Sequence, residues 1–264
     1  MRGIYRAFDS HAHFNHGSPF DSPVGYAGIP AGVQRLDLPS ILGEYARIGI
    51  LGGGFSTFAS VMEHPECVEE ENEYLFNLAK ERKQVRQWVV VDPRKRETFS
   101  QADAMLDSKN TLGIKIHPVY HGYDVTEYAD KIFSFAAARR AVVLMHPQSI
   151  ERMPEFADRY LDMTLIIAHL NDRKPGLYLD AIRAAKNGNL YTDTSGGSLT
   201  LNYALEYAVE AVGADKILFG TDTYSCGLRY GRIAFSDLSE DDKKKIFFDN
   251  ALRLFPRALE EYAE

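Results

Sequence analysis

Short apolar runs alternate along the chain with longer segments in which apolar residues recur at helical spacing. Several runs are rich in β-branched residues and apolar on both faces, as expected of parallel strands that helices cover. The eight runs that we predict as strands are residues 5–10, 48–52, 85–91, 112–117, 141–146, 165–169, 190–194 and 217–220.

The segments between these runs carry helical periodicity. An (i, i+4, i+7, i+8) pattern predicts amphipathic helices; it is formed by Tyr128, Ile132, Phe135 and Ala136, in similar form by Leu201, Ala204, Leu205, Ala208 and Val212, and less cleanly from Leu75 to Arg82. Ser239 followed by Asp242 resembles a capping box, and it opens a last predicted helix with Ile246, Phe247 and Leu254 facing inward.

Eight strands that alternate with about eight helices predict a closed (β/α)8 TIM barrel rather than an open doubly wound sheet. A chain of 264 residues suits one such domain, spanning residues 1–264. No GxGxxG motif follows the first strand, which argues against a Rossmann fold. Residues 52–54 form a triple glycine without the Lys-Ser/Thr of a phosphate loop, and we interpret it as a tight turn.

Residues 15–39 interrupt the alternation with several glycines and prolines. The segment follows the first strand, so it lies on the rim where barrel active sites are built. A loop of this length predicts a lid or a substrate-binding element, with a plain surface excursion as the alternative. It also leaves open a homo-oligomer in which a neighbouring subunit closes the pocket.

Composition narrows the class of protein. The hydrophobic fraction of 45% and the charged fraction of 25% are ordinary for a soluble globular protein. A net charge of −7 argues against a nucleic-acid partner, and no apolar run is long enough to span a bilayer. No signal-peptide pattern opens the chain, and Cys67 and Cys226 lie outside any CxxC motif, so we expect reduced thiols in a cytoplasmic protein without a membrane partner.

Imidazole and carboxylate side chains stand where the apolar runs end. His11 and His13 are two residues apart, so on a strand both point to the same side, where they can grip a metal such as zinc. In a closed barrel Asp222, after the eighth strand, lies beside them. His146 approaches from the fifth strand and His169 from the sixth. This convergence predicts a divalent-metal site on one rim, and hence an enzyme.

The fourth strand adds Lys115 and His117 on one face. Lys115 has three alternatives: it carries positive charge toward the substrate, it becomes carboxylated and bridges two metals, or it pairs with Asp193. We expect His117, next to Pro118, to be structural or to support a ligand.

Further polar residues lie on the predicted rim. Asp193 and Ser195 on the seventh strand are expected to orient a ligand. Arg173, Arg229 and Tyr120 lie in rim loops and are candidates for holding a substrate carboxylate.

As an ordered series, these pieces resemble the amidohydrolase superfamily, and within it the amidohydrolase 2 branch that includes aminocarboxymuconate-semialdehyde decarboxylase. The matching pieces span nearly the whole chain: Asp9-Ser10-His11-Ala12-His13, Gly113-Ile114-Lys115-Ile116-His117-Pro118, Leu144-Met145-His146-Pro147, Ile167-Ala168-His169-Leu170, Tyr191-Thr192-Asp193-Thr194-Ser195-Gly196, Leu218-Phe219-Gly220-Thr221-Asp222 and Asn250-Ala251-Leu252-Arg253-Leu254-Phe255.

The resemblance implies ligands for one divalent metal, namely His11, His13, His146 and Asp222. It implies His169 as an acid/base group or an additional ligand. In other branches a carboxylated lysine of the fourth strand holds a second metal, so Lys115 leaves a second ion open. Zinc is the expected metal, with manganese or another divalent ion as the alternative.

The leading functional expectation is a metal-dependent hydrolase that activates water to attack a carbonyl of a small-molecule amide, lactone or ester. Asp222 would accept the proton of that water, and His169 or Lys115 would polarise the carbonyl oxygen. The alternative is metal-dependent non-oxidative decarboxylation of a small carboxylic acid. A further alternative is a non-catalytic barrel that binds a small ligand, although the intact histidines and Asp222 argue against it.

Overall fold

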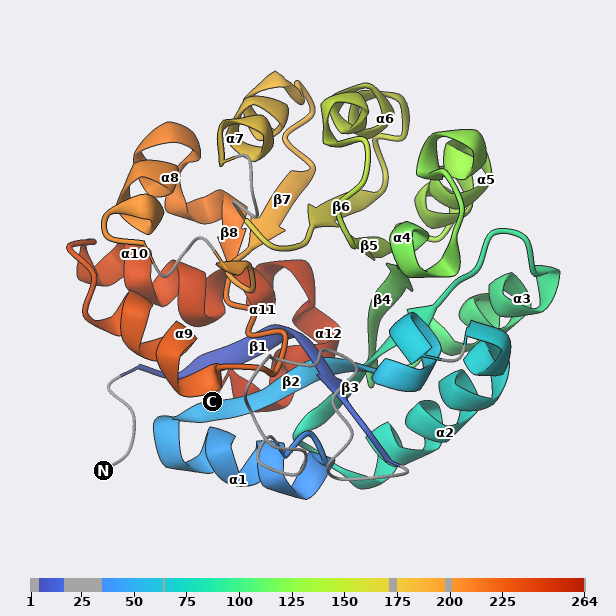
Figure 1. Cartoon of the computed structure of the whole chain (residues 1–264), viewed down its shortest axis with the longest axis horizontal. Coiled ribbons are helices and arrows are strands. Elements are labelled where there is room, and N and C mark those ends of the chain that lie inside the picture. The colour runs from blue at the N-terminus through green and yellow to red at the C-terminus, as the bar shows by residue number, and fades with distance from the viewer. Residues whose placement is uncertain (1–4, 17–34, 64, 171–174, 198–200, 264) are drawn as a thin grey trace, which may run out of the picture.

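The computed structural model describes residues 5–16, 35–63, 65–170, 175–197 and 201–263. Its centre is one eight-stranded parallel sheet in which each strand pairs with the next in sequence (Figure 1). The strands are β1 (Ala7–Phe14), β2 (Ile50–Thr57), β3 (Val85–Val90), β4 (Thr111–Ile116), β5 (Val142–Met145), β6 (Thr164–Ile167), β7 (Leu190–Asp193) and β8 (Ile217–Leu218).

Backbone hydrogen bonds bring the last strand back to the first. Ser10 N donates to Phe219 O at 2.8 Å, and Asp222 N donates to His11 O at 2.8 Å. Helices surround the strands on the outside (Figure 1). The predicted (β/α)8 TIM barrel is therefore confirmed, and the rim formed by the carboxyl ends of the strands is one continuous surface.

The α-helices are α1 (Leu38–Ile48), α2 (Val68–Glu81), α3 (Arg96–Met105), α4 (Pro118–His121), α5 (Val125–Ala138), α6 (Met153–Arg159), α7 (Pro175–Ala184), α8 (Ala204–Val212), α9 (Cys226–Ala234), α10 (Glu240–Lys244), α11 (Asn250–Leu254) and α12 (Pro256–Leu259). Shorter 3-10 or π segments are η1 (Ala59–Glu63), η2 (Pro65–Cys67), η3 (Ile150–Arg152), η5 (Ala214–Lys216), η6 (Lys245–Asp249) and η7 (Glu260–Tyr262).

Side-chain caps set several helix starts. The Asp37 carboxylate accepts a hydrogen bond from Ser40 N at 3.0 Å and begins α1. The predicted cap at Ser239 is confirmed, because Ser239 Oγ accepts from Asp242 N at 3.1 Å; the Asp242 carboxylate accepts from the Ser239 hydroxyl at 2.7 Å, whereas in a full capping box it would accept from the backbone N–H of Ser239. Each cap satisfies backbone N–H groups that the first helical turn leaves without a partner.

The barrel interior is a separate apolar core, closed at the amino-terminal end by the C-terminal helices. Phe8, Trp88 and Leu218 from the strands pack there with Phe255 and Leu259 from the last helices. The Trp88 and Phe255 rings meet edge to face, with centroids 5.6 Å apart. The last helices thus close the end of the barrel opposite the rim that the carboxyl ends of the strands form.

The triple glycine is not a tight turn, so that interpretation is wrong. Gly52, Gly53 and Gly54 all lie inside β2. A Cβ on Gly54 would lie 2.3 Å from a Leu112 methyl carbon and 2.7 Å from Trp88 Nε1. Glycine is required there because the large interior side chains fill the space that a side chain from β2 would need.

Other differences concern element bounds. β1 runs to Phe14, so His11 and His13 lie within the strand rather than beyond it. Leu201 is 62% exposed and precedes α8, which begins at Ala204, so the periodicity was wrong at its first position. Most of the predicted lid, residues 17–34, lies outside the described residues.

The structure also bears on thiols and membrane segments. Cys67 and Cys226 are both free cysteines. Within the described ranges, no helix combines the length and apolar character that crossing a bilayer requires.

Candidate metal centre

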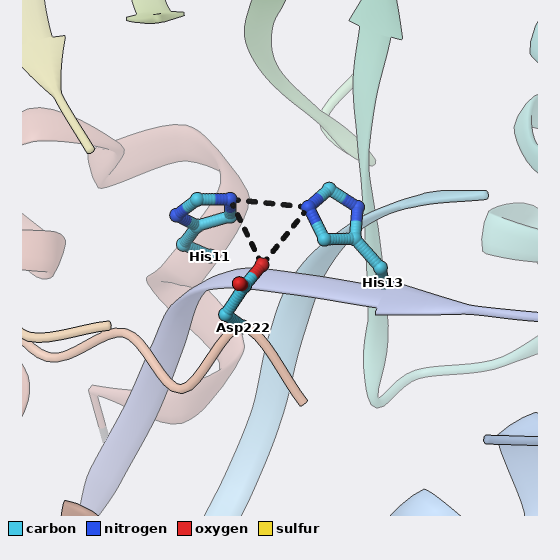
Figure 2. Close-up of side chains that lie close together, drawn as sticks. All are labelled: His11, His13 and Asp222. Carbon is cyan, nitrogen blue, oxygen red and sulfur yellow. Dashed lines mark hydrogen bonds and ion pairs between the residues drawn. The ribbon is translucent and has the colours of Figure 1, made fainter. Parts of the chain in front are cut away.

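Three donor atoms converge on the carboxyl rim, two from β1 and one from the segment after β8 (Figure 2). His11 Nε2 lies 3.1 Å from His13 Nε2, and Asp222 Oδ1 lies 3.6 Å from the first and 3.3 Å from the second. The two imidazoles are nearly perpendicular, at 83°. The structure thus brings together the pair and the carboxylate that the sequence predicts to meet.

The other nitrogen of each imidazole is already occupied. His11 Nδ1 lies 2.9 Å from Asp193 Oδ2, which fixes it as the proton-bearing nitrogen. His13 Nδ1 lies 3.3 Å from the Ser56 carbonyl oxygen and 2.9 Å from Ser56 Oγ. A carbonyl can only accept, so both Nε2 atoms turn lone pairs toward the convergence point.

This donor set fits a divalent cation. Two lone pairs and a carboxylate oxygen that face one another repel; the Lys115 ammonium, 2.9 Å from His11 Nε2, offsets part of this repulsion, and a cation at the convergence point would be attracted by all three donors. Donors about 2.1 Å from a shared tetrahedral or octahedral ion would lie about 3.0–3.4 Å from each other. The separations of 3.1, 3.3 and 3.6 Å are close to that range.

Burial sets the protonation of this cluster. It lowers the pKa of His11 to about 3, with the charge of Lys115 acting in the same direction, and it also lowers the pKa of His13. Burial alone would raise the pKa of Asp222, but the neighbouring histidines, His169 first and then His13, outweigh it and leave that pKa below the usual range. Neutral imidazoles beside an ionised carboxylate are the forms that bind metals.

Lys115 reaches the same point from β4. Its Nζ lies 2.9 Å from His11 Nε2, and the residue is fully buried. Burial lowers the pKa of its ammonium to about 8. Of the sequence alternatives, pairing with Asp193 is not the contact found, because the His11 imidazole lies between the two residues, bonded to both.

His169 and His146 lie farther along the rim. His169 Nδ1 is 2.8 Å from Ser195 Oγ, and its Nε2 is 3.2 Å from His146 Nδ1. The His146 ring stacks on His117, with centroids 3.9 Å apart. A second donor group consists of His11, His169 and Asp193. His146 therefore stands at the rim in contact with His169, while its predicted role as a ligand stays a prediction.

The outer candidates are placed differently from one another. Arg229 is buried in α9 and donates to the Gly196 carbonyl oxygen. Tyr120 is 50% exposed in α4. Arg173 lies outside the described residues. Their proposed contact with a substrate carboxylate stays a prediction.

Three residues that support the cluster had no role predicted from the sequence: Asp9, Ser56 and Thr223. Asp9 is fully buried, and burial raises the pKa of its carboxyl to about 7 even though it accepts several hydrogen bonds. Neither Asp9 nor Thr223 had a usable signal in the sequence. The register of β1 shifts between Asp9 and Ala12, so the spacing of Asp9 from His11 does not place them on one face. The backbone of Thr223 has a positive φ of 68°, which is rare for a β-branched residue.

Solved structures with a similar fold include several decarboxylases. A dihydroxybenzoic acid decarboxylase from Polaromonas sp. JS666, with bound manganese and 2-nitroresorcinol, is 16% identical, with a TM-score of 0.73 over 96% of this chain and 97% of that chain. A 5-carboxyvanillate decarboxylase from Novosphingobium aromaticivorans DSM 12444, with manganese and 4-hydroxy-3-methoxy-5-nitrobenzoic acid, is 13% identical, with a TM-score of 0.72 over 96% of each chain. An amidohydrolase 2 from Bifidobacterium longum subsp. infantis is 20% identical, with a TM-score of 0.65 over 96% of this chain and 99% of that chain.

At these identities the structural likeness shows a shared fold. No curated protein sequence matches the chain. The profile of the amidohydrolase family matches residues 8–257, from the first barrel strand to the last helices. Because that match covers nearly the whole barrel, the chain belongs to the amidohydrolase family.

Proposed function

We propose that this protein is a metal-dependent decarboxylase that removes carbon dioxide from a small aromatic carboxylic acid without oxidation. The observation that carries the proposal is the convergence of His11, His13 and Asp222 on the rim of a barrel that shares its fold with manganese-containing decarboxylases. Hydrolysis was the leading expectation from the sequence. Two structures of similar fold are manganese-containing decarboxylases, and they favour the decarboxylase alternative instead.

Aromatic side chains beside the donors support an aromatic substrate. The Phe58 ring lies 5.2 Å from the His13 ring, and the Tyr224 ring lies 5.6 Å from Phe58. Flat apolar faces next to a metal centre suit a planar ring whose carboxylate points to the cation. The buried ammonium of Lys115 adds positive charge on the same rim, which favours an anionic substrate.

His11, His13 and Asp222 would hold the ion, and His146 would reach it from β5 if it acts as a further ligand. The bound ion supplies positive charge that polarises a substrate oxygen and stabilises the negative charge that develops there. We propose manganese as the ion, because it is present in both decarboxylases. Zinc is the second choice, because imidazole nitrogens suit it well.

We assign the proton transfer to Asp222. Its side chain is 22% exposed, so it faces the space from which substrate arrives, and its lowered pKa leaves it ionised in the free protein, the form that can accept a proton. It takes the proton of a substrate hydroxyl and returns it to the ring carbon. The bond from that carbon to the carboxylate breaks with its electron pair left on the ring, and carbon dioxide leaves.

His169 and Lys115 would assist without taking part in bond breaking. His169 is oriented by Ser195, whose backbone N–H donates to Asp193 at 2.9 Å. This arrangement fixes the ring of His169 at the rim. Lys115 would hold the negative charge of the substrate carboxylate until it departs as neutral carbon dioxide.

Hydrolysis of a small amide, lactone or ester is the second candidate. The observation that favours it is the same ionised Asp222, since a carboxylate beside a metal can accept a proton from attacking water. The two reactions therefore differ in substrate rather than in the residues required.

One experiment separates them. The protein is stripped of metal, reloaded with Mn²⁺ or Zn²⁺, and assayed for carbon dioxide release from hydroxybenzoates and for hydrolysis of lactones and esters. We expect carbon dioxide release that needs the ion and is lost in Asp222→Asn. Metal-dependent hydrolysis without carbon dioxide release would replace the proposal by the second candidate.

We also propose a cytoplasmic location, because two free cysteines suit a reducing compartment. A small-molecule substrate is the partner that the rim favours. The expected homo-oligomer stays a prediction, to be checked by light scattering of the purified protein.

A further inference from the structure

The contact between β8 and β1 is built differently from the other strand contacts of the barrel. β8 has two residues, and both pair with β7. Beyond them, side chains complete the contact with β1 along the segment that carries Asp222. The register of β1 shifts between Asp9 and Ala12, so Asp9 falls outside the alternation that His11 and His13 share, and its carboxylate reaches Tyr45 of α1 on the helix side of the strand.

Asp9 forms the inner half of this contact. Its Oδ1 accepts from His11 N at 3.1 Å and from Thr221 N at 3.0 Å. Its Oδ2 accepts from the hydroxyls of Thr221 and of Tyr45 in α1. A single buried carboxylate therefore joins the residue before Asp222 to the strand that carries both imidazoles.

Thr223 forms the outer half. Its Oγ1 accepts from His13 N at 2.7 Å and donates to His13 O at 2.7 Å. Its own N–H donates to Thr221 Oγ1 at 3.0 Å, which links the two halves. Asp222 lies between them, with its N–H bonded to His11 O at 2.8 Å.

The backbone inside this contact is strained. Asp222 and Thr223 have φ values of 53° and 68°, in the left-handed region that side-chain-bearing residues rarely adopt. Such conformations persist only where surrounding interactions hold them in place. Here those interactions come from Asp9 on one side and from the Thr223 hydroxyl on the other.

We propose that Asp9, Thr221 and Thr223 are positioning residues that hold Asp222 in register with His11 and His13 so that the three donors can share one cation. The inference rests on the proposed metal-dependent function but not on the reaction that follows. It differs from a merely structural role, which would lower stability and leave the affinity of the folded protein for metal unchanged.

The test is a calorimetric titration of Mn²⁺ into metal-free protein. Thermal unfolding is measured on the same samples. We expect Asp9→Asn and Thr223→Val each to weaken Mn²⁺ binding by about 10- to 100-fold, as is usual when a residue that orients a metal ligand is lost. Thr223→Ser keeps the hydroxyl and should restore most of the affinity. If Asp9→Asn does not fold, Tyr45→Phe, which removes one of the four bonds to Asp9, should weaken binding by a smaller factor.

Thr98→Val provides the matched control. Thr98 is a fully buried threonine whose hydroxyl also donates to backbone, but it lies at α3, away from β1 and β8. Loss of the Thr98 hydroxyl should lower thermal stability and leave Mn²⁺ affinity unchanged. Equal affinity in Thr223→Val and the unaltered protein, or equal loss of affinity in Thr98→Val, would overturn the inference.

The outcome is separable from that of the proposed function. If the unaltered protein binds Mn²⁺ but releases no carbon dioxide, the decarboxylase proposal fails and the affinity series still decides the role of Asp9 and Thr223. If the unaltered protein binds neither Mn²⁺ nor Zn²⁺, the positioning role is overturned as well.

Discussion

The two ends of the barrel use buried polar groups in opposite ways. At the carboxyl rim, His11, His13 and Asp222 face one another with atoms that all carry lone pairs: two imidazole nitrogens and a carboxylate oxygen. At the amino end, the buried Arg86 guanidinium donates to the Ala258 and Lys83 carbonyl oxygens and to the Glu261 carboxylate. The rim gathers three donor atoms that the Lys115 ammonium neutralises in part, whereas the amino end pairs its buried charge fully with partners from the last helices and the β3 region.

Backbone strain occurs beside the donors as well. Positive φ values at His169, Asp222 and Thr223 lie at the carboxyl rim, and among the residues at the other end Arg140, just before β5, has a positive φ of 49°. The amino end is filled instead by the last helices, with the Arg86 guanidinium 5.2 Å from the centre of the Tyr262 ring. The comparison indicates that this barrel separates stability from chemistry, so substitutions at the two ends should have separable effects.

The largest expected effect is on activity at the rim. Asp222→Asn replaces the proposed proton carrier, an ionised donor to the cation, by a neutral amide, so carbon dioxide release should fall by about 10²- to 10⁴-fold. Steady-state assays at saturating Mn²⁺ measure this loss. Full activity in the folded variant would remove Asp222 from the reaction.

The next-largest effect is on the stability contributed by the amino end of the barrel. Arg86→Met leaves the carbonyl and carboxylate partners of Arg86 without a donor, and the free energy of unfolding should fall by about 2–4 kcal/mol. Arg183→Met is the control: its guanidinium is 53% exposed and pairs with Asp180, and exposed pairs contribute less than about 1 kcal/mol. Urea unfolding measures the free energy of unfolding of the two variants. Similar losses in Arg86→Met and Arg183→Met would contradict the stabilising role given to Arg86 at the amino end.

Metal binding at the rim should stabilise the folded protein. Mn²⁺ at about 100 times its dissociation constant should raise the free energy of unfolding by about 2.7 kcal/mol, because it binds the folded state alone. His13→Gln should abolish most of this gain, whereas Arg86→Met should retain it. Thermal unfolding with and without Mn²⁺ measures both, and a gain that survives His13→Gln would argue against this donor set.

The smallest effects concern the glycines. Gly54→Ala places a methyl group against Trp88 and Leu112, so the free energy of unfolding should fall by about 1–3 kcal/mol. Gly231→Ala, in α9 with open space around the added carbon, should instead raise it by about 0.5–1 kcal/mol. Opposite signs in chemical unfolding are the expected result. A stabilising Gly54→Ala would contradict the packing given for the barrel interior.

Local patterns predicted most of the fold and the centre of the candidate site. Apolar runs identified the eight strands, and the alternation on β1 placed His11 and His13 on one side. The glycines of β2 were misinterpreted because the groups that exclude a side chain are distant in sequence, such as Trp88 at Gly54 and Tyr262 at Gly52. Propensity describes a residue's own backbone, whereas the need for glycine there is set by tertiary packing.

The supporting contacts could not be predicted for a similar reason. The pairing of Asp9 with Thr221 spans 212 positions and depends on how the barrel closes. Thr223 adopts a backbone conformation that its residue type disfavours, so no local rule indicates it. The hydrogen bonds of Arg86 at the amino end could not be predicted either, because its partners come from the last helices of the chain.

The central claim is that His11, His13 and Asp222 share one divalent cation. A crystal structure of the protein soaked with Mn²⁺, with data collected for anomalous scattering, tests it most directly. We expect one anomalous peak about 2.0–2.3 Å from His11 Nε2, His13 Nε2 and Asp222 Oδ1. A peak bound elsewhere, or an empty convergence point at saturating Mn²⁺, would contradict the account.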